Sequence, residues 1–180
     1  KKDELLKGID EAIGSAQFAM TIIKDYIQSH QKETDSFASF DSNFMGLVQP
    51  DGSLEHYDGN LRVKDTDGNI LIDQTPPSDY LSIIAEATED WSYLKFPFFK
   101  NKGYPEGAYR VGPLARLNLI DKISTPLAHR EWLNWKSLNG GIQHSSFYYH
   151  YARMIEALYG VERIQQLLND PDILPAFALH

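Results

Sequence analysis

Apolar residues recur at three- and four-residue spacing through the N-terminal part of the chain. This spacing places them on one side of a helix. The residues in this stripe are Leu5, Leu6, Ile9, Ile13, Ala16, Met20, Ile23 and Ile27. The pattern predicts one long helix over residues 3–31, within an N-terminal segment 1–32. A stripe of this width indicates that the helix packs in a bundle with further helices.

The next part of the chain alternates short apolar runs with turn sequences. The runs are Phe44–Val48, Leu54–Tyr57, Leu61–Val63 and Ile70–Ile72. Asp-Gly lies between them in PDGS (50–53), YDGN (57–60) and DTDGN (65–69). Glycine supplies the positive φ that tight hairpins need. The pattern predicts a small antiparallel meander of three or four strands.

Residues 43–98 are expected to form this sheet together with a covering helix. Ser78 follows two prolines and is a plausible N-cap for a helix over 79–92. Its inner face would hold apolar side chains, namely Ile83, Ile84, Ala87 and Trp91. The aromatic run 91–100 comes directly afterwards.

The C-terminal part of the chain, 126–170, is expected to be helical. Pro126 suits the first position of a helix that continues to Ser137. Further helices are predicted over 143–159 and 161–168, separated by Gly160. The fold class is therefore α+β, with a long helix, a small sheet and a helical C-terminal part.

Between these parts, residues 99–125 are expected to form an irregular loop that contains YRVGPLARLN (109–118). Gly112 and Pro113 interrupt regular structure and let the backbone approach a neighbour closely. Arg110 and Arg116 flank this break, and each guanidinium presents a planar set of donors that stays charged. Two interpretations stay open for these four residues: they brace loop backbone, or they contact a partner across an interface.

The composition narrows the classes of function. The chain has 180 residues and a formal net charge of −8. An acidic surface argues against binding nucleic acid or an anionic membrane. No stretch reaches the length of a membrane-spanning helix. The sequence contains no cysteine and begins at Lys1, which favours a cytoplasmic location and suggests a trimmed or excised segment.

Histidines and acidic turns give no metal site. His144 and His150 are six residues apart, so on a helix they point in different directions, and no HExxH motif occurs. In DTDGN, Gly68 stands fourth, whereas calcium loops have glycine at the sixth position. A hairpin turn and ordinary hydrogen-bonded histidines are the favoured interpretations.

Other catalytic patterns are also lacking. Glu86, Glu89 and Asp90 have the spacing of a solvated helix face. Gly140-Gly141 has no neighbouring lysine or threonine for phosphate binding. The aromatic cluster near the histidines is explained by helix packing, and it comprises Tyr148, Tyr149 and Tyr151. We therefore expect no catalytic, cofactor-binding or metal-binding residue in this chain.

Several stretches together resemble the large subunit of nickel–iron hydrogenases, in particular the soluble bidirectional NAD(P)-linked type. They occur in the order found in that family and cover nearly the whole chain. The matching strings are MGLVQPDGSLEHYDGNLR (45–62), EDWSYLKFPFFK (89–100), YRVGPLARLN (109–118), TPLA (125–128), YARMIEALYG (151–160) and LLNDPD (167–172).

This resemblance implies a role as scaffold. In the family, two CxxC motifs supply the thiolates that hold a nickel–iron centre, where hydrogen is cleaved heterolytically. Because this chain has no cysteine, the resemblance implies a single internal segment (1–180) of a large subunit, inactive alone and without its own cofactor. The implied partners are the remaining segments of that polypeptide, diaphorase subunits and an iron–sulfur small subunit. The parent would interconvert hydrogen with protons and electrons and feed NAD(P) or ferredoxin.

Two alternatives remain. The first is a metal-free protein-interaction module derived from the same family. The second is a small acid–base hydrolase, for which the sequence offers no perturbed carboxylate or histidine in a pocket. The apolar stripe and the aromatic run 91–99 also lead us to expect that the chain self-associates or exposes apolar surface.

Overall fold

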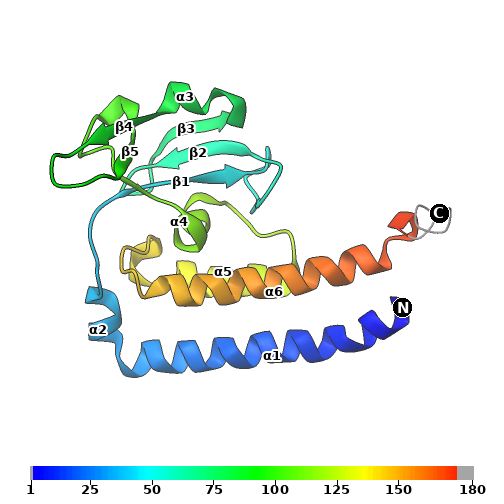
Figure 1. Ribbon diagram of the computed structural model, residues 1–180. Coiled ribbons are helices and arrows are strands. Elements are labelled where there is room, and N and C mark those ends of the chain that lie inside the picture. Colours follow the sequence, from blue (N-terminus) through cyan, green and yellow to red (C-terminus); the bar gives the residue numbers. More distant parts are fainter. Residues whose placement is uncertain (1, 174–180) are drawn as a thin grey trace.

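The computed structural model describes residues 2–173. It has three layers, with a β-sheet on one side, a short buried helix in the middle and a layer of long helices on the other side (Figure 1). The short helix α4 (Gly112–Leu119) contacts both strand β1 and helix α6. The α+β class expected from the sequence is confirmed. Nothing in the described part supports the further expectation of a larger helical bundle.

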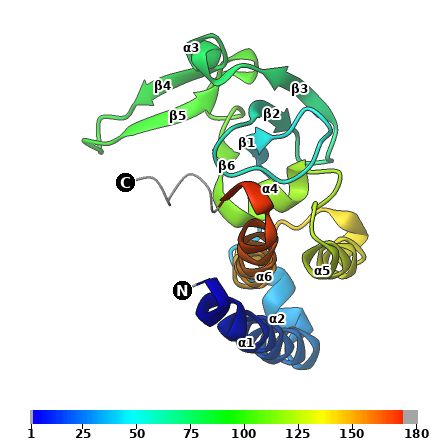
Figure 2. The same ribbon diagram turned by 90° about the vertical axis from the view of Figure 1, so that its right-hand side faces the viewer.

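The long N-terminal helix is confirmed as α1 (Lys2–Ser29), and a short helix α2 (Gln31–Ser36) follows it. Helix α1 lies along helix α6, with their axes side by side in Figures 1 and 2. Only Ile9, Met20 and Ile27 of α1 are buried. The other side of the helix exposes large apolar side chains, namely Leu5, Phe18, Ile22 and Tyr26.

The main sheet has four strands in the order β3-β2-β1-β6. Strands β1 and β2, and β2 and β3, are antiparallel, whereas β6 runs parallel to β1. The strands are β1 (Asn43–Val48), β2 (Asn60–Lys64), β3 (Ile70–Thr75) and β6 (Tyr109–Arg110). The DTDGN hairpin is confirmed, since Asp65 and Asn69 close the turn and Gly68 has a φ of +85°.

The strand expected over Leu54–Tyr57 is wrong. Leu54 makes only an isolated bridge with Val48. The carboxylate of Glu55 accepts hydrogen bonds from the backbone N–H groups of His56 and Tyr57, each at 2.7 Å. These are the donors that a strand would use in its ladder, so the local side-chain turn replaces the strand.

The helix expected over 79–92 is also wrong. A 3-10 turn η1 (Pro77–Asp79) and one turn of helix, α3 (Tyr80–Ile83), lead into β4 (Ile84–Thr88). Strand β4 pairs with β5 (Lys95–Phe99) in a separate two-stranded sheet. The small side chains Ala85 and Ala87 lie opposite Phe98 and Phe96. Cross-strand packing on these aromatic rings outweighs the helical preference of the sequence.

The segment 99–125 is not irregular throughout. It contains a 3-10 turn η2 (Lys100–Lys102), strand β6 and helix α4. Pro113 is compatible with α4 because it stands in the first turn, where an amide N–H has no partner inside the helix. The apolar side chains that follow are fully buried and stabilise the helix; they are Leu114, Ala115, Leu117 and Leu119.

The C-terminal part is helical, as expected, with helix α5 (Pro126–Lys136) beginning at Pro126. A 3-10 turn η3 (Asn139–Gly141) follows, and then α6 (Tyr148–Asn169) and η4 (Pro171–Ile173). The expected break at Gly160 is wrong, since α6 runs through it. A glycine inside a helix costs about 1 kcal/mol, and the packing of α6 on α1, α4 and α5 offsets this cost.

Helix α6 also supplies the cap of helix α5. Glu162 is 4% exposed and accepts hydrogen bonds from the N–H groups of Leu127 and Ala128, both at 2.9 Å. It accepts a third from the hydroxyl of Thr125 at 2.5 Å. These donors have no partner within the helix, so one carboxylate satisfies the N-terminus of α5 and ties it to α6.

Substitution of Glu162 tests this contact. We expect Glu162→Ala to lower the free energy of unfolding by about 2–4 kcal/mol, because buried donors lose their acceptor. Urea denaturation followed by circular dichroism measures the change. Glu11→Ala, on the exposed part of α1, is the control and should change stability by less than about 0.5 kcal/mol. Equal effects of the two substitutions would contradict the capping role.

Candidate functional site: the arginine segment and its surroundings

The segment 109–118 turns sharply from strand β6 into helix α4 at Gly112. Gly112 has a φ of +79°, in the left-handed region that glycine adopts at low cost. A Cβ atom there would lie 3.6 Å from the ring of Tyr149, which is an ordinary contact. The Tyr149 hydroxyl donates a hydrogen bond to the carbonyl of Val111 at 2.9 Å. Backbone conformation, and not space, therefore requires glycine at the entry to α4.

Arg110 is buried, with 7% of its surface exposed, and holds two other loops. Its Nη1 donates to the carbonyl of His144, and its Nη2 donates to the carbonyl of Ala38 at 3.2 Å. The guanidinium also lies over the ring of Phe40, 3.9 Å from the ring centre. Burial lowers the pKa of Arg110 below its ordinary value. Arg110 thus joins the chain before β1 to the loop before α6.

Arg116 lies on α4 and makes a bidentate ion pair with Glu156 of α6. Its Nε and Nη2 donate to the two carboxylate oxygens at 2.6 and 2.7 Å. His56 lies on the other side of Glu156, with its Nε2 3.5 Å from Oε1. Burial tends to raise the pKa of Glu156, but hydrogen bonds and charge from Arg116 and His56 outweigh it, so this pKa is lowered. Glu156 is therefore a carboxylate in the folded protein.

A cavity of about 270 Å³ adjoins this ion pair. One part of its lining is apolar and comes from strand β1 and its neighbours, including Met45 and Leu61. The polar part comprises Glu55, His56 and Arg116. The guanidinium of Arg116 is already paired with the carboxylate of Glu156. The lining residues come from the strands β1, β2, β4 and β6, from helix α4 and from the turn at 55–56, so the cavity lies at a junction between these elements.

A second buried network, not predicted from the sequence, links the sheet to α4. Arg62 donates to both carboxylate oxygens of Asp73, at 2.8 and 3.1 Å, and to Asp121 at 2.8 Å. Lys64 donates to the carbonyl of Asn118 at 3.2 Å, and burial lowers its pKa. Arg62 lies in the predicted strand Leu61–Val63 and Lys64 directly follows it; two cations two residues apart along an extended chain lie on the same face, and that spacing is a usable signal.

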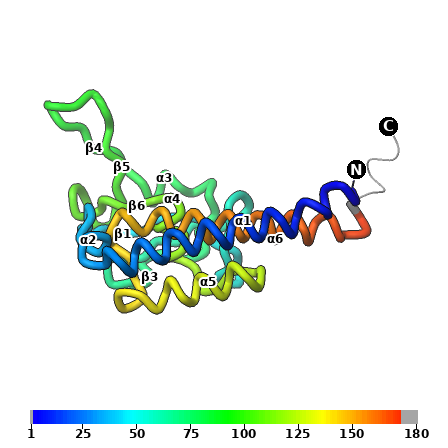
Figure 3. Tube along the Cα trace, turned by 90° about the horizontal axis from the view of Figure 1, so that it is seen from below, coloured from blue at the N-terminus to red at the C-terminus, as the bar shows by residue number. Residues whose placement is uncertain are grey.

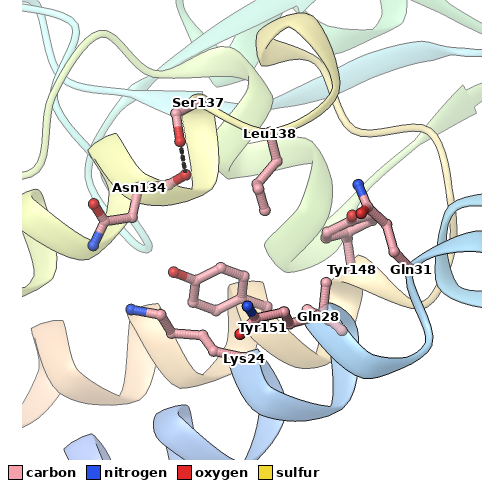
Figure 4. Close-up of a pocket in the computed structure, with 9 residues that line it drawn as sticks. Lys24, Gln28, Gln31, Asn134, Ser137, Leu138, Tyr148 and Tyr151 are labelled. Atoms are coloured by element: carbon pink, nitrogen blue, oxygen red, sulfur yellow. Dashed lines mark hydrogen bonds between the residues drawn. The ribbon is translucent and has the colours of Figure 1, made fainter.

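A third polar cluster lies between α1, α5 and α6, next to the pocket drawn in Figure 4. Tyr148 and Tyr151 of α6 and Lys24 of α1 line a cavity of about 390 Å³. Glu131 accepts hydrogen bonds from Lys24 at 3.1 Å and from the Tyr151 hydroxyl at 3.0 Å. Burial and the charge of Glu131 raise the pKa of Tyr151. Because Lys24 and Glu131 already pair with each other, this cluster is a helix-to-helix contact.

The histidines do not converge on a metal site. His144 lies in the loop before α6, with its Nδ1 buried and without a hydrogen-bond partner, whereas His150 is exposed on α6. Within residues 2–173, no three His, Asp or Glu side chains are placed to hold a metal ion together. None of the helices described there has the length and apolar character needed to cross a membrane.

Comparison with known proteins gives relatives over almost the whole chain. It is 36% identical over 172 residues to the beta subunit of the NAD-reducing hydrogenase HoxS of Cupriavidus necator, covering 95% of this chain and 35% of that protein. It is 36% and 37% identical to vhu-type F420-non-reducing hydrogenase subunits of Methanocaldococcus jannaschii and of Methanococcus voltae, covering 41% of each. No protein-family model matches the chain.

A solved structure has the same fold. The crystal structure of an NAD+-reducing [NiFe]-hydrogenase in the H2-reduced state superposes with a TM-score of 0.89 at 39% identity, covering 96% of this chain and 38% of that one. The chain is therefore similar, over almost its whole length, to part of each of these hydrogenase proteins. It spans between 35% and 41% of the length of the relatives named above.

These relatives correct one expectation from the sequence. The resemblance was assigned to a nickel–iron large subunit, with the chain as an internal fragment of it. The relatives are instead the beta subunit of an NAD-reducing hydrogenase and the vhu-type subunits of F420-non-reducing hydrogenases. The assignment to the nickel–iron large subunit is therefore replaced by similarity to the subunits named above.

Two glycines provide a matched test of the turn into α4. We expect Gly112→Ala to lower the free energy of unfolding by about 1–2 kcal/mol, because alanine is strained at positive φ. Gly160→Ala lies inside α6, where a Cβ atom meets nothing within 4 Å, and should stabilise by up to about 1 kcal/mol. Urea denaturation measures both changes. Stabilisation by Gly112→Ala would contradict the assigned backbone role.

The ion pair predicts a pH dependence. The pKa of Glu156 is lowered in the folded protein. Its contribution to stability is therefore complete above the unfolded-state pKa and is lost as the pH falls through the folded-state pKa. We expect the free energy of unfolding to fall less steeply below about pH 5 in Glu156→Gln than in the unaltered protein. Denaturant titrations across this pH range measure the slopes, and identical slopes would contradict the prediction.

Proposed function

We propose that the chain is a structural part of a hydrogenase subunit of the kind represented by these relatives. The assembly that contains it would interconvert hydrogen with protons and electrons and pass the electrons to NAD(P) or ferredoxin. The observation that supports this proposal is the fold shared with the NAD+-reducing [NiFe]-hydrogenase at a TM-score of 0.89 and 39% identity. At that identity the relationship extends beyond a common fold.

Within this assembly the chain would position other elements. Arg110 holds two loops, and Arg116 joins α4 to α6. Both guanidinium groups are engaged with groups of this chain, which favours a bracing role over contact with a partner. A contact between another surface of the segment 109–118 and another subunit remains a prediction.

A thiolate-bound metal centre does not fit the donors of this chain. The sequence contains no cysteine, and soft thiolates are the ligands by which nickel and iron are held in such a site. We therefore infer that a nickel–iron centre in the assembly would be held by residues outside this chain. The proposed partners are iron–sulfur and diaphorase subunits, and the proposed location is the cytoplasm.

A metal-free interaction module is the second candidate function. The observation that favours it is the set of large apolar side chains exposed on the β4–β5 hairpin, which includes Trp91 and Tyr93. Self-association through the exposed side of α1 is a further proposal. A nickel determination on the purified 180-residue chain does not separate the two candidates, because both predict no bound nickel.

Activity of the assembly tests the proposal. The polypeptide that contains this chain is tagged in its own cells, and the complex is purified and assayed for hydrogen-dependent reduction of NAD+ and of a viologen dye. We expect both activities, or dye reduction alone if ferredoxin is the acceptor. A purified complex without hydrogen-dependent dye reduction would contradict the proposal.

Arg116→Met tests the scaffold role within the same complex. We expect a several-fold lower yield of assembled complex, since Glu156 loses its partner, with specific activity per complex changed less than about twofold. Arg130→Met, on the exposed side of α5, is the control and should leave the yield unchanged. A normal yield combined with a more than tenfold lower specific activity would indicate that Arg116 acts in the chemistry instead.

A further inference from the structure

The hairpin formed by β4 and β5 projects from the body of the molecule, as Figures 2 and 3 show from two directions. It forms its own two-stranded sheet and is not hydrogen-bonded to the four-stranded sheet. An isolated hairpin is only marginally stable in water. We call residues 84–99 the arm, and residues 89–94, which connect its strands, the tip.

The tip exposes large apolar side chains to solvent. Tyr93 is 96% exposed, Trp91 75% and Leu94 57%. Aromatic side chains of this size each bury roughly 150–250 Å² when they are covered. Water-exposed patches of this kind mark sites of protein–protein contact, and Trp and Tyr are the residue types that dominate binding energy at interfaces.

Ring contacts hold the arm in one shape. The ring centres of Trp91 and Phe96 are 5.3 Å apart. Tyr104, from the segment after the arm, contacts Phe96 at 6.2 Å and Phe98 at 5.9 Å. This ladder fixes the direction of the arm while leaving Tyr93 and Leu94 outside it. A tip that is already ordered loses little conformational entropy on binding.

The charge of the arm indicates what covers it. Between residues 84 and 99 there are three carboxylates, Glu86, Glu89 and Asp90, and one ammonium group, Lys95. Lys95 pairs with Glu86 at 3.0 Å on the strands, and Glu89 interacts with Tyr104. Asp90 is exposed beside Trp91. The tip therefore presents aromatic rings with a negative charge next to them.

From this arrangement we propose that the arm docks into another subunit of the hydrogenase assembly, in an apolar pocket with lysine or arginine at its rim. A second copy of this chain is disfavoured because it would bring Asp90 against an acidic surface of net charge −8. The identity of the partner as a hydrogenase subunit rests on the proposed function. The interface itself rests on the exposure, ring contacts and charge of the tip.

The direct test places a photo-cross-linking amino acid at Tyr93 in the tagged polypeptide, in its own cells. The expected result is an adduct with a different hydrogenase subunit, identified by mass spectrometry. An adduct with a second copy, with another part of the same polypeptide or with a protein that is not a hydrogenase subunit would overturn the proposal. The absence of any adduct would overturn it as well.

Substitutions at the tip measure its contribution. We expect Tyr93→Ala combined with Leu94→Ser to lower recovery of the cross-link partner with the tagged chain at least tenfold, and Asp90→Lys to lower it several-fold at low salt. Trp91 is kept so that its stacking on Phe96 is preserved. The matched control is Tyr57→Ala, because Tyr57 is 92% exposed on a different turn, and it should leave recovery unchanged. Equal recovery with the tip variants would overturn the proposal.

Hydrogen-dependent dye reduction, measured on the same unaltered preparation, separates the two claims. Dye reduction without an adduct at Tyr93 overturns the docking proposal alone. An adduct with a different protein but no dye reduction overturns the proposed function, and with it the partner's identity as a hydrogenase subunit.

Discussion

Burial of helix α4 between the sheet and helix α6 is the constraint on which the other parts of the structure depend. Five of its eight residues, Leu114, Ala115, Leu117, Asn118 and Leu119, are buried. Strand β1 covers one side of α4 and α6 covers the other. The two outer layers thus share one core through a helix of little more than two turns.

Polar contacts fix the position of this buried helix. Arg116 reaches α6 through Glu156, and Asn118 exchanges hydrogen bonds with the backbone of Gln143 at 3.0 and 3.1 Å. From the sheet, Arg62 donates to the carbonyl of Leu119 at 3.0 Å. Buried polar groups stabilise a fold only when they are paired. These pairings therefore specify one orientation of α4, and apolar contact alone would specify it less well.

The sequence predicted those elements whose signals are local. The period of α1, the Asp-Gly hairpin at 65–69 and the start of α5 at Pro126 each follow from residues close in the chain. Residues 79–92 have a helical period and so predict a helix, whereas the strand that pairs with residues 84–88, Lys95–Phe99, lies beyond this stretch. In the sequence, Gly112-Pro113 indicates a break, and hence a loop, whereas in the structure it starts helix α4. The four residues Arg110, Gly112, Pro113 and Arg116 were selected by composition and spacing, but their partners were not predictable. Glu156 is forty residues from Arg116, and the carbonyls of Ala38 and His144 accept from Arg110 only because two loops meet there.

Because α4 joins the two outer layers, it should open only when the whole fold does. Native-state hydrogen exchange of the α4 amides, measured in increasing denaturant, tests this coupling most directly. We expect the opening free energy of residues 116–119 to equal that of global unfolding, within about 0.5 kcal/mol. Exchange through a partial opening more than about 2 kcal/mol below the global value would contradict the role of α4 as the shared core of the layers.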